Sequence, residues 1–124
     1  MQRNQKLPMP MLLCVGAINT FLIQKKLRGY VSINVQSGEA LDTHSFATLI
    51  GVGATTVNPY LAFDSLYQRH SKKLFEQFSF DDCVKRYIKS VNAGLLKIMS
   101  KMGISVLSSY RGGCNFETVG LSRT

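Results

Sequence analysis

The stretch from Ser79 to Met102 constrains the fold of this chain more than any other part of the sequence. Its apolar residues recur every three or four positions, which is the spacing of one face of an α-helix. These residues are Phe80, Val84, Tyr87, Ile88, Val91, Leu95, Ile98 and Met102. Their burial contributes on the order of 10–20 kcal/mol before chain entropy is subtracted. We therefore expect this helix to pack against a large apolar surface.

Local signals mark both ends of the predicted helix. Ser79 followed by Asp82 resembles a capping box, in which polar side chains satisfy the first free N–H groups of a helix. Gly103 suits the left-handed conformation that ends many helices. Residues 104–110, ISVLSSY, are predicted to form a strand, and the glycine-rich segment after them is predicted to lead into another helix.

The residues before Ser79 alternate between helical and strand patterns. Strands are predicted over residues 30–36 and 54–59, and helices over residues 11–28, which Gly29 follows, over 43–50, with Asp42 as N-cap, and from Pro59 to about Gln68. Helices that alternate with strands are typical of a parallel sheet with helical crossovers. We therefore predict the α/β class, built from partial parallel-sheet αβ units.

Composition and charge limit the partners of the chain. Its 124 residues include 45% apolar and 18% charged residues, which is typical of one globular domain. The formal charge is +8, but the lysines and arginines are scattered, so solvated helix faces are favoured over a nucleic-acid interface. The apolar run near the amino end is shorter than the ~20 residues of a membrane span. We expect a cytoplasmic protein without a nucleic-acid or membrane partner.

The sequence offers few residues for catalysis or metal binding. Cys14, Cys83 and Cys114 lie far apart, without the short spacing of metal-binding pairs. His44 and His70 are isolated, and no nucleophile motif accompanies them. We therefore predict neither a metal ligand nor a catalytic residue.

One candidate binding site stands out among the predicted strand ends. Ligands of parallel α/β folds bind where strands end, and here these places are residues 36–39, 56–58 and 108–113. The last is the richest, because Ser108, Ser109 and Tyr110 supply hydroxyl groups and Arg111 a fixed positive charge, which together suit a phosphate. Composition alone favours a simpler alternative, in which these are ordinary turn and cap residues.

Three long segments carry a resemblance to a known family. They are PMLLCVGAINTFLIQKKLRGYVSINVQSGEA, FATLIGVGATTVNPYLAF and YIKSVNAGLLKIMSKMGISVLSSYRGGCNFETVGLS. Together they closely resemble the large subunit of glutamate synthase, from about Leu7 to the carboxyl end. The resemblance implies that residues 1–77 are the C-terminal part of the family's central α/β domain. Residues 78–124 would begin its FMN-binding, TIM-like β/α barrel, with residues 104–110 as the first strand.

The same resemblance implies a function for the parent protein. Glutamate synthase converts 2-oxoglutarate and glutamine-derived ammonia to glutamate, using FMN, an iron–sulfur cluster and electrons from NAD(P)H or ferredoxin. This chain lacks the glutaminase, most of the barrel and the cluster cysteines, so we expect a truncated fragment that is inactive alone and binds no cofactor alone. Ser108, Ser109, Tyr110 and Arg111 would lie at the FMN face of the intact enzyme.

Two alternatives stay open on these residues. The chain would be one piece of a split glutamate synthase, with separately encoded fragments or the small subunit as partners. The less favoured alternative is a small basic module that binds RNA, because of the excess of lysine and arginine.

Overall fold

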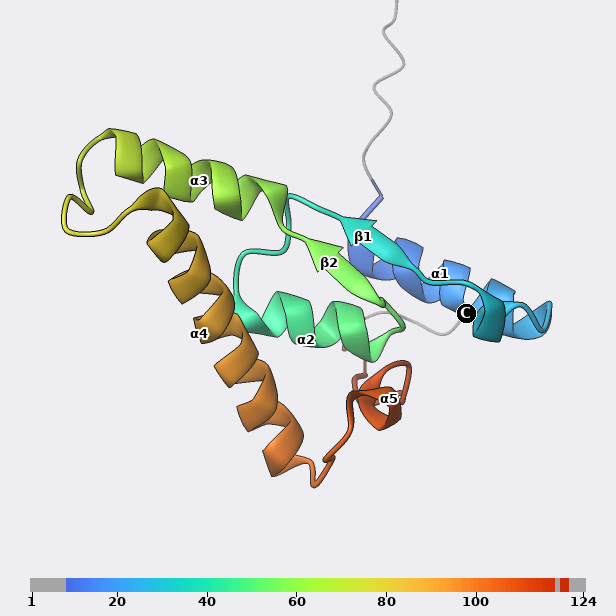
Figure 1. Ribbon diagram of the computed structural model, residues 1–124. Helices are drawn as coiled ribbons and strands as arrows, with labels where there is room; N and C mark the ends of the chain where they lie inside the picture. The colour runs from blue at the N-terminus through green and yellow to red at the C-terminus, as the bar shows by residue number, and fades with distance from the viewer. Residues whose placement is uncertain (1–8, 118, 121–124) are drawn as a thin grey trace, which may run out of the picture.

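The computed structural model describes residues 9–117 and 119–120, which form a mixed α/β arrangement (Figure 1). Its strands are β1 (Asn34–Gln36) and β2 (Thr56–Asn58), and its helices are α1 (Met11–Gln24), the 3₁₀ turn η1 (Arg28–Tyr30), α2 (Thr43–Gly51), α3 (Tyr60–Ser71), α4 (Phe80–Lys101) and α5 (Leu107–Tyr110). In Figure 1, α3 and α4 lie to one side of the strands and α1 to the other.

The two strands pair in parallel, with Val35 opposite Val57 and α2 in the connection between them. Both are shorter than the predicted strands, because residues 28–30 form η1 and pairing begins only at Asn34. Just before the strands, the Thr55 N–H donates to the Ile33 carbonyl at 2.8 Å. The predicted α/β class with a small parallel sheet is confirmed.

Helix α2 lies at the centre of the packing, in contact with β2, α1 and α4. The buried core joins residues from α1, α2, α4, β1 and the turns beside the strands: Val15, Ile33, Val35, Ala40, Phe46, Leu49, Ala54 and Val91. Val57 of β2 is partly buried and packs against this core. A nine-residue helix is too short to be stable alone, so these contacts hold α2 in place.

Polar side chains begin α2 and α4 as predicted. The Asp42 carboxylate accepts the Ser45 N–H at 2.9 Å, and hydrogen bonds from Ser45 hold the pKa of Asp42 below its usual value. At α4, the Ser79 hydroxyl oxygen accepts the Asp82 N–H at 3.1 Å. Each cap satisfies an N–H group that has no partner inside its helix.

Helices α1 to α4 all end in the same way, with a residue of positive φ after the C-cap. These residues are Lys26, Gly53, Lys73 and Gly103. In α1 the Lys26 N–H donates to Ile23 and the Leu27 N–H to Leu22, at 2.9 and 2.8 Å, which is a Schellman motif. The predicted helix over residues 11–28 was therefore too long, because the chain turns at Lys26 and not at Gly29.

The strand predicted over residues 104–110 is wrong. Leu107–Tyr110 form the short helix α5, in which the Ser109 N–H donates to Val106 and the Arg111 N–H to Leu107. A strand needs a neighbour to pair with, and the described part of the chain has only β1 and β2, paired with each other. No helix forms in residues 112–117, and residues 118 and 121–124 lie outside the description.

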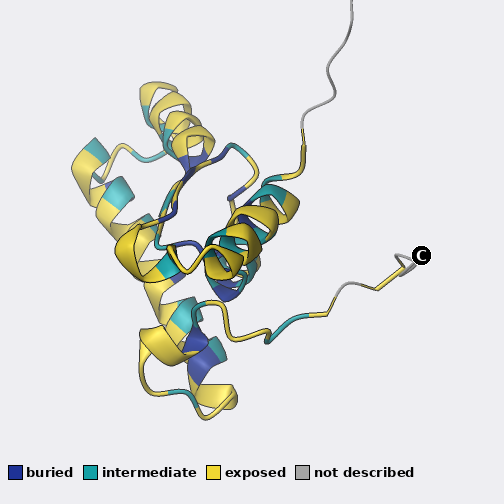
Figure 2. Ribbon diagram, turned by 90° about the vertical axis from the view of Figure 1, so that its right-hand side faces the viewer, coloured by how far each residue is buried: buried dark blue, intermediate teal, exposed yellow. Residues whose placement is uncertain are grey.

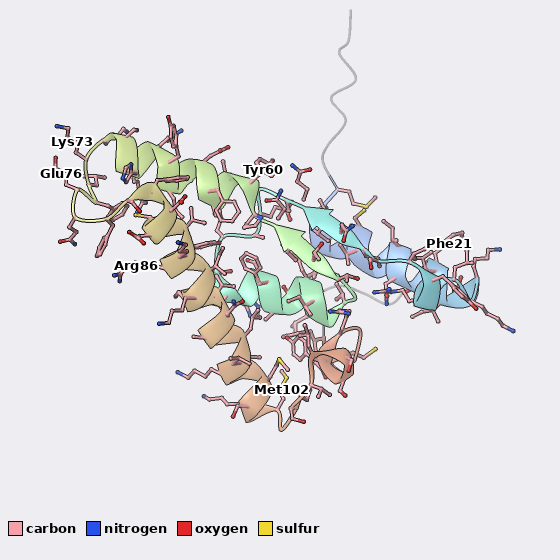
Figure 3. All side chains as sticks on the ribbon, in the orientation of Figure 1. Phe21, Tyr60, Lys73, Glu76, Arg86 and Met102 are labelled. Carbon is pink, nitrogen blue, oxygen red and sulfur yellow. The ribbon has the colours of Figure 1, made fainter. Side chains whose placement is uncertain are left out.

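The long helix α4 exists, but its apolar face is only partly covered. Val91 is buried, whereas Ile88 and Met102 keep 44% and 42% of their surface exposed. Cys83 and Met99, outside the predicted stripe, are buried instead. Figure 2 shows exposed residues along most of the helices, and Figure 3 places Met102 at the far end of α4. The large surface expected to cover α4 is not supplied by the described residues, because α2 and α3 cover only part of it.

Replacing Gly94 tests the contact between α4 and α2. A Cβ at Gly94 would lie 2.5 Å from Cγ2 of Thr43, far inside van der Waals contact. We expect Gly94→Ala to lower the free energy of unfolding by about 1–3 kcal/mol, although alanine favours helices. Denaturant unfolding measures this loss. A gain in stability would contradict the close approach, and Ser90→Ala on the exposed side of α4 is the control.

Replacing Lys26 tests the end of α1. Its φ of 58° lies in the left-handed region, which costs a non-glycine residue roughly 1 kcal/mol. We expect Lys26→Gly to raise the free energy of unfolding by up to about that amount. Lys25→Gly removes the same charge at a residue with φ −82°, and should give no gain. Equal effects of the two variants would show that the backbone at residue 26 is not strained.

Candidate functional site

The structure separates the four predicted site residues. Tyr110 is fully buried, and its hydroxyl donates to the Ala47 carbonyl of α2 at 2.8 Å. Ser109 is exposed. Ser108 and Arg111 instead line one pocket. The four residues therefore do not share one binding face.

The pocket that holds Ser108 and Arg111 has a volume of about 440 Å³. We call it the arginine pocket, because it contains two arginines. It is lined by Asn19, Ile23, Arg28, Gly29, Val31, Ser32, Thr55, Ser108, Arg111 and Gly112. Ser32 and Thr55 lie just before the strands, so the pocket is at the amino ends of β1 and β2. Residues 104–110 are not a strand, so these residues do not stand at a carboxyl strand end, and their place at an FMN face stays a prediction.

Arg28 is held in the pocket wall by three hydrogen bonds. Its Nε donates to Oδ1 of Asn19 at 2.7 Å, its Nη1 to the Val31 carbonyl at 2.8 Å and its Nη2 to the Gly53 carbonyl at 2.8 Å. These bonds join η1 to the body of α1 and to the turn after α2. All three acceptors are neutral, so they fix the guanidinium without balancing its charge.

Arg111 is less well satisfied than Arg28. Its Nε is buried and has no hydrogen-bond partner among the described residues. Within residues 9–117 and 119–120, the ion pair found is Lys73 with Glu76, at 4.0 Å on the surface. No carboxylate of that part of the chain therefore pairs with either arginine of the pocket.

Two glycines of residues 51–54, GVGA, allow close packing against Asn19 of α1 and against the carboxyl-terminal segment. Gly53 has φ 126°, and a Cβ there would lie 2.5 Å from the Asn19 side chain that accepts from Arg28. A Cβ on Gly51 would lie 2.6 Å from the ring of Phe116. Both positions exclude larger residues because of close neighbours, which the sequence motif alone did not indicate.

The other two predicted ligand-binding strand ends, residues 36–39 and 56–58, differ from the arginine pocket. At residues 36–39, the buried Ser37 accepts the Glu39 N–H at 3.0 Å, and the Glu39 carboxylate accepts the Met11 N–H at 3.2 Å. At residues 56–58, Asn58 lines an apolar groove of about 360 Å³ between α2, β2, α3 and α4. Neither place gathers charged side chains.

The described residues contain neither a cluster of metal-ligating side chains nor a membrane-spanning helix. No group of three or more histidine, cysteine, aspartate or glutamate side chains is placed to hold a metal ion in this part of the chain. Among the helices of residues 9–117, none is long and apolar enough to cross a membrane.

Comparison with known proteins identifies the family. The family model described as "Glutamate synthase central domain" matches residues 1–122. The large chain of NADPH glutamate synthase from Azospirillum brasilense is 56% identical over 114 residues, which are 92% of this chain and 8% of that relative. The chain therefore belongs to the glutamate synthase central domain family.

Two further relatives match, one named for NADPH and one for ferredoxin. The NADPH glutamate synthase large chain of Bacillus subtilis is 49% identical over 97% of this chain. The ferredoxin-dependent glutamate synthase of Spinacia oleracea is 45% identical over 92% of it. In both cases the chain spans 8% of the relative's length. The resemblance to glutamate synthase is confirmed.

The proposed division of the chain at residues 77 and 78 stays a prediction. The family-model match runs across it, and α4, which lies beyond it, packs against α2 and α3. The FMN-barrel assignment of residues 78–124 likewise stays a prediction.

Removing the Tyr110 hydroxyl tests the contact that holds α5 on α2. We expect Tyr110→Phe to lower the free energy of unfolding by about 1 kcal/mol at pH 7, since the buried bond to Ala47 is lost. Burial raises the pKa of Tyr110, so stability that is present below the unfolded pKa of about 10 falls as pH rises above it. The variant should lose less stability between pH 9 and 11. Tyr30→Phe, at a residue 87% exposed, should change neither the free energy of unfolding at pH 7 nor its loss between pH 9 and 11.

Proposed function

We propose that this chain supplies a central-domain segment of a glutamate synthase large chain and takes part in glutamate synthesis only together with the other segments. The family-model match over residues 1–122 carries the proposal. The proposed overall reaction is the family's reductive conversion of 2-oxoglutarate with glutamine-derived ammonia. The proposed location is the cytoplasm.

Exposed apolar residues on α1 support a role inside a larger protein. Leu13, Phe21 and Ile23 keep 52%, 56% and 57% of their surfaces exposed, and only Val15 of this helix is buried. Phe21 lies on the part of α1 far from α4 (Figure 3). Soluble monomers seldom expose so many apolar side chains along one helix. Another segment of the large chain would bury them.

The apolar groove beside α4 supports the same proposal. Its wall includes Phe63, Ile88 and Leu95, from α3 and α4. Asn92, one turn after Ile88, also lines it, and both residues are exposed, as is Leu96 beyond them at 65%. A covering segment would complete the burial that the sequence of α4 predicts.

The cofactors are proposed to belong to the assembled enzyme. FMN and the iron–sulfur cluster would be held chiefly by other segments, and we carry the predicted FMN contact only to Ser108 and Arg111. Tyr110 is unsuitable, because it is buried and its hydroxyl is bonded to Ala47. Its proposed role is to hold the segment in position.

A chimera tests the proposed function. The matching segment of the Azospirillum brasilense large chain is replaced by this chain, and glutamine-dependent glutamate formation is assayed with NADPH. We expect activity within about tenfold of the parent, none for a large chain with the segment deleted, and none for this chain alone. A chimera that folds and binds its cofactors normally but makes no glutamate would contradict the proposal, as would turnover by the chain alone. Adding this chain as a separate polypeptide to the large chain that lacks the segment tests the alternative of a split enzyme.

Substitution of Phe21 tests whether α1 becomes covered. In this chain alone, Phe21→Ser should change the free energy of unfolding by less than about 0.5 kcal/mol, since the ring is already exposed. In the chimera the same change should cost about 2–4 kcal/mol, because the ring is then buried. Thermal unfolding of the parent and the Phe21→Ser variant, in this chain alone and in the chimera, measures the two effects. Equal effects in the two settings would show that α1 stays exposed.

A further inference from the structure

We propose that the apolar groove beside α4 is covered by an acidic amphipathic segment of the same large chain, whose carboxylates pair with Lys85 and Lys89. The inference rests on the proposed function, because it takes the covering segment from the large chain. The family match assigns no occupant to this groove. The observation that carries the inference is an exposed ridge of α4 that adjoins the groove and holds both lysines.

Four exposed residues of α4 form this ridge. Lys85, Lys89, Asn92 and Leu96 follow one another at spacings of four, three and four positions, which places them in one line along an α-helix. We call this line the lysine ridge. Asn92 also lines the apolar groove, as does its neighbour one turn earlier, Ile88. The lysine ridge therefore borders the groove, and a segment seated in the groove passes beside both lysines.

Apolar surface continues from the groove onto the lysine ridge. Ile88 in the groove wall keeps 44% of its surface exposed, and Leu96 on the ridge keeps 65%. The helices in contact with α4, which are α2 and α3, leave both side chains uncovered. One covering segment would bury both, so its apolar side is expected over these residues and its edge beside Lys85 and Lys89.

The two lysines have no acidic partner among the described residues. Within residues 9–117 and 119–120, the ion pair found is Lys73 with Glu76, and none joins Lys85 to Asp81 one turn before it. Two like charges one turn apart destabilise a helix, so the spacing of Lys85 and Lys89 does not favour α4 by itself. Carboxylates on a covering segment would replace this repulsion with attraction and fix the register of the segment in the groove.

The same features disfavour other occupants. A second copy of this chain carries the same net charge of +8 and would be repelled by the lysines. An anionic membrane binds helices whose exposed face combines cations with several large apolar residues, and the lysine ridge offers Leu96 alone. Single-stranded nucleic acid is favoured by aromatic rings and arginines, and neither belongs to the ridge. Arg86, beside it in the sequence, lies over the ring of Phe78 at 4.1 Å.

Limited acetylation tests whether the lysine ridge is covered. Acetic anhydride modifies this chain alone and the chimera with the Azospirillum brasilense large chain, and mass spectrometry identifies the modified lysines. We expect Lys85 and Lys89 to react at least about fivefold more slowly in the chimera, because a paired carboxylate favours the protonated, unreactive amine. The reactivity of Lys72, exposed at the end of α3, should change by less than about twofold. Equal reactivity of the ridge lysines in both settings, or equal protection of Lys72, would overturn the proposal.

Peptide binding tests the same contact without a folded chimera. The probes are overlapping peptides of about 20 residues, close to the length of α4, which together cover the rest of the Azospirillum brasilense large chain. We expect the peptides that bind to be amphipathic and rich in carboxylates. The double variant Lys85→Gln/Lys89→Gln should weaken their binding by about tenfold.

A matched double variant controls for net charge. Arg69→Gln/Lys72→Gln removes two charges from the exposed end of α3 and should change peptide binding by less than about twofold. Circular dichroism checks that both double variants fold. Absence of any bound peptide, or equal losses in the two double variants, would overturn the proposal.

Two further probes distinguish the kinds of occupant. They are a single-stranded RNA oligonucleotide and vesicles that contain phosphatidylserine. Binding of either probe that requires Lys85 and Lys89, without binding of any peptide, would contradict a protein segment as the occupant. Protection of both lysines in an inactive chimera would support this inference while the proposed function fails. An active chimera with fully reactive lysines would contradict this inference alone.

Discussion

The close packing around α2 is the constraint on which the rest of the structure depends. This short helix connects the two paired strands, and three other segments approach it: α4 through Gly94, the carboxyl-terminal segment through Phe116, and α5 through the hydroxyl of Tyr110. Each approach requires a small residue or a specific polar group. The core is therefore held by shape at a few positions as much as by the amount of apolar surface.

Helix starts were predictable from the sequence, and helix ends only in part. Asp42 and Ser79 act through local hydrogen bonds, so residue type and spacing are sufficient to find them. Gly103 was recognisable for the same reason. Lys26 and Lys73 end their helices in the same left-handed conformation, but lysine carries no such signal, so the boundaries there were missed.

The candidate site was less predictable than the fold. Residues 104–110 resemble a strand by composition. A short apolar run of this kind does not by itself specify a strand, because its structure depends on the partner against which it packs. Here the buried hydroxyl of Tyr110 bonds to Ala47 and holds the segment against α2. Arg111 was found from the sequence because it is charged and follows hydroxyl residues. Arg28 was not, because its bonds to Asn19 and Gly53 join positions that share no periodic pattern.

The connection between α3 and α4 has a consequence for how the chain tolerates change. Residues 72–74 and 76–77 are exposed there, and the Lys73–Glu76 pair at the surface is a weak restraint. The two helices that it connects, α3 and α4, pack against each other, and α4 also packs against α2. Insertions of different length in this connection, or cleavage by trypsin after Lys72 or Lys73, would therefore leave the segment before it and α4 packed together.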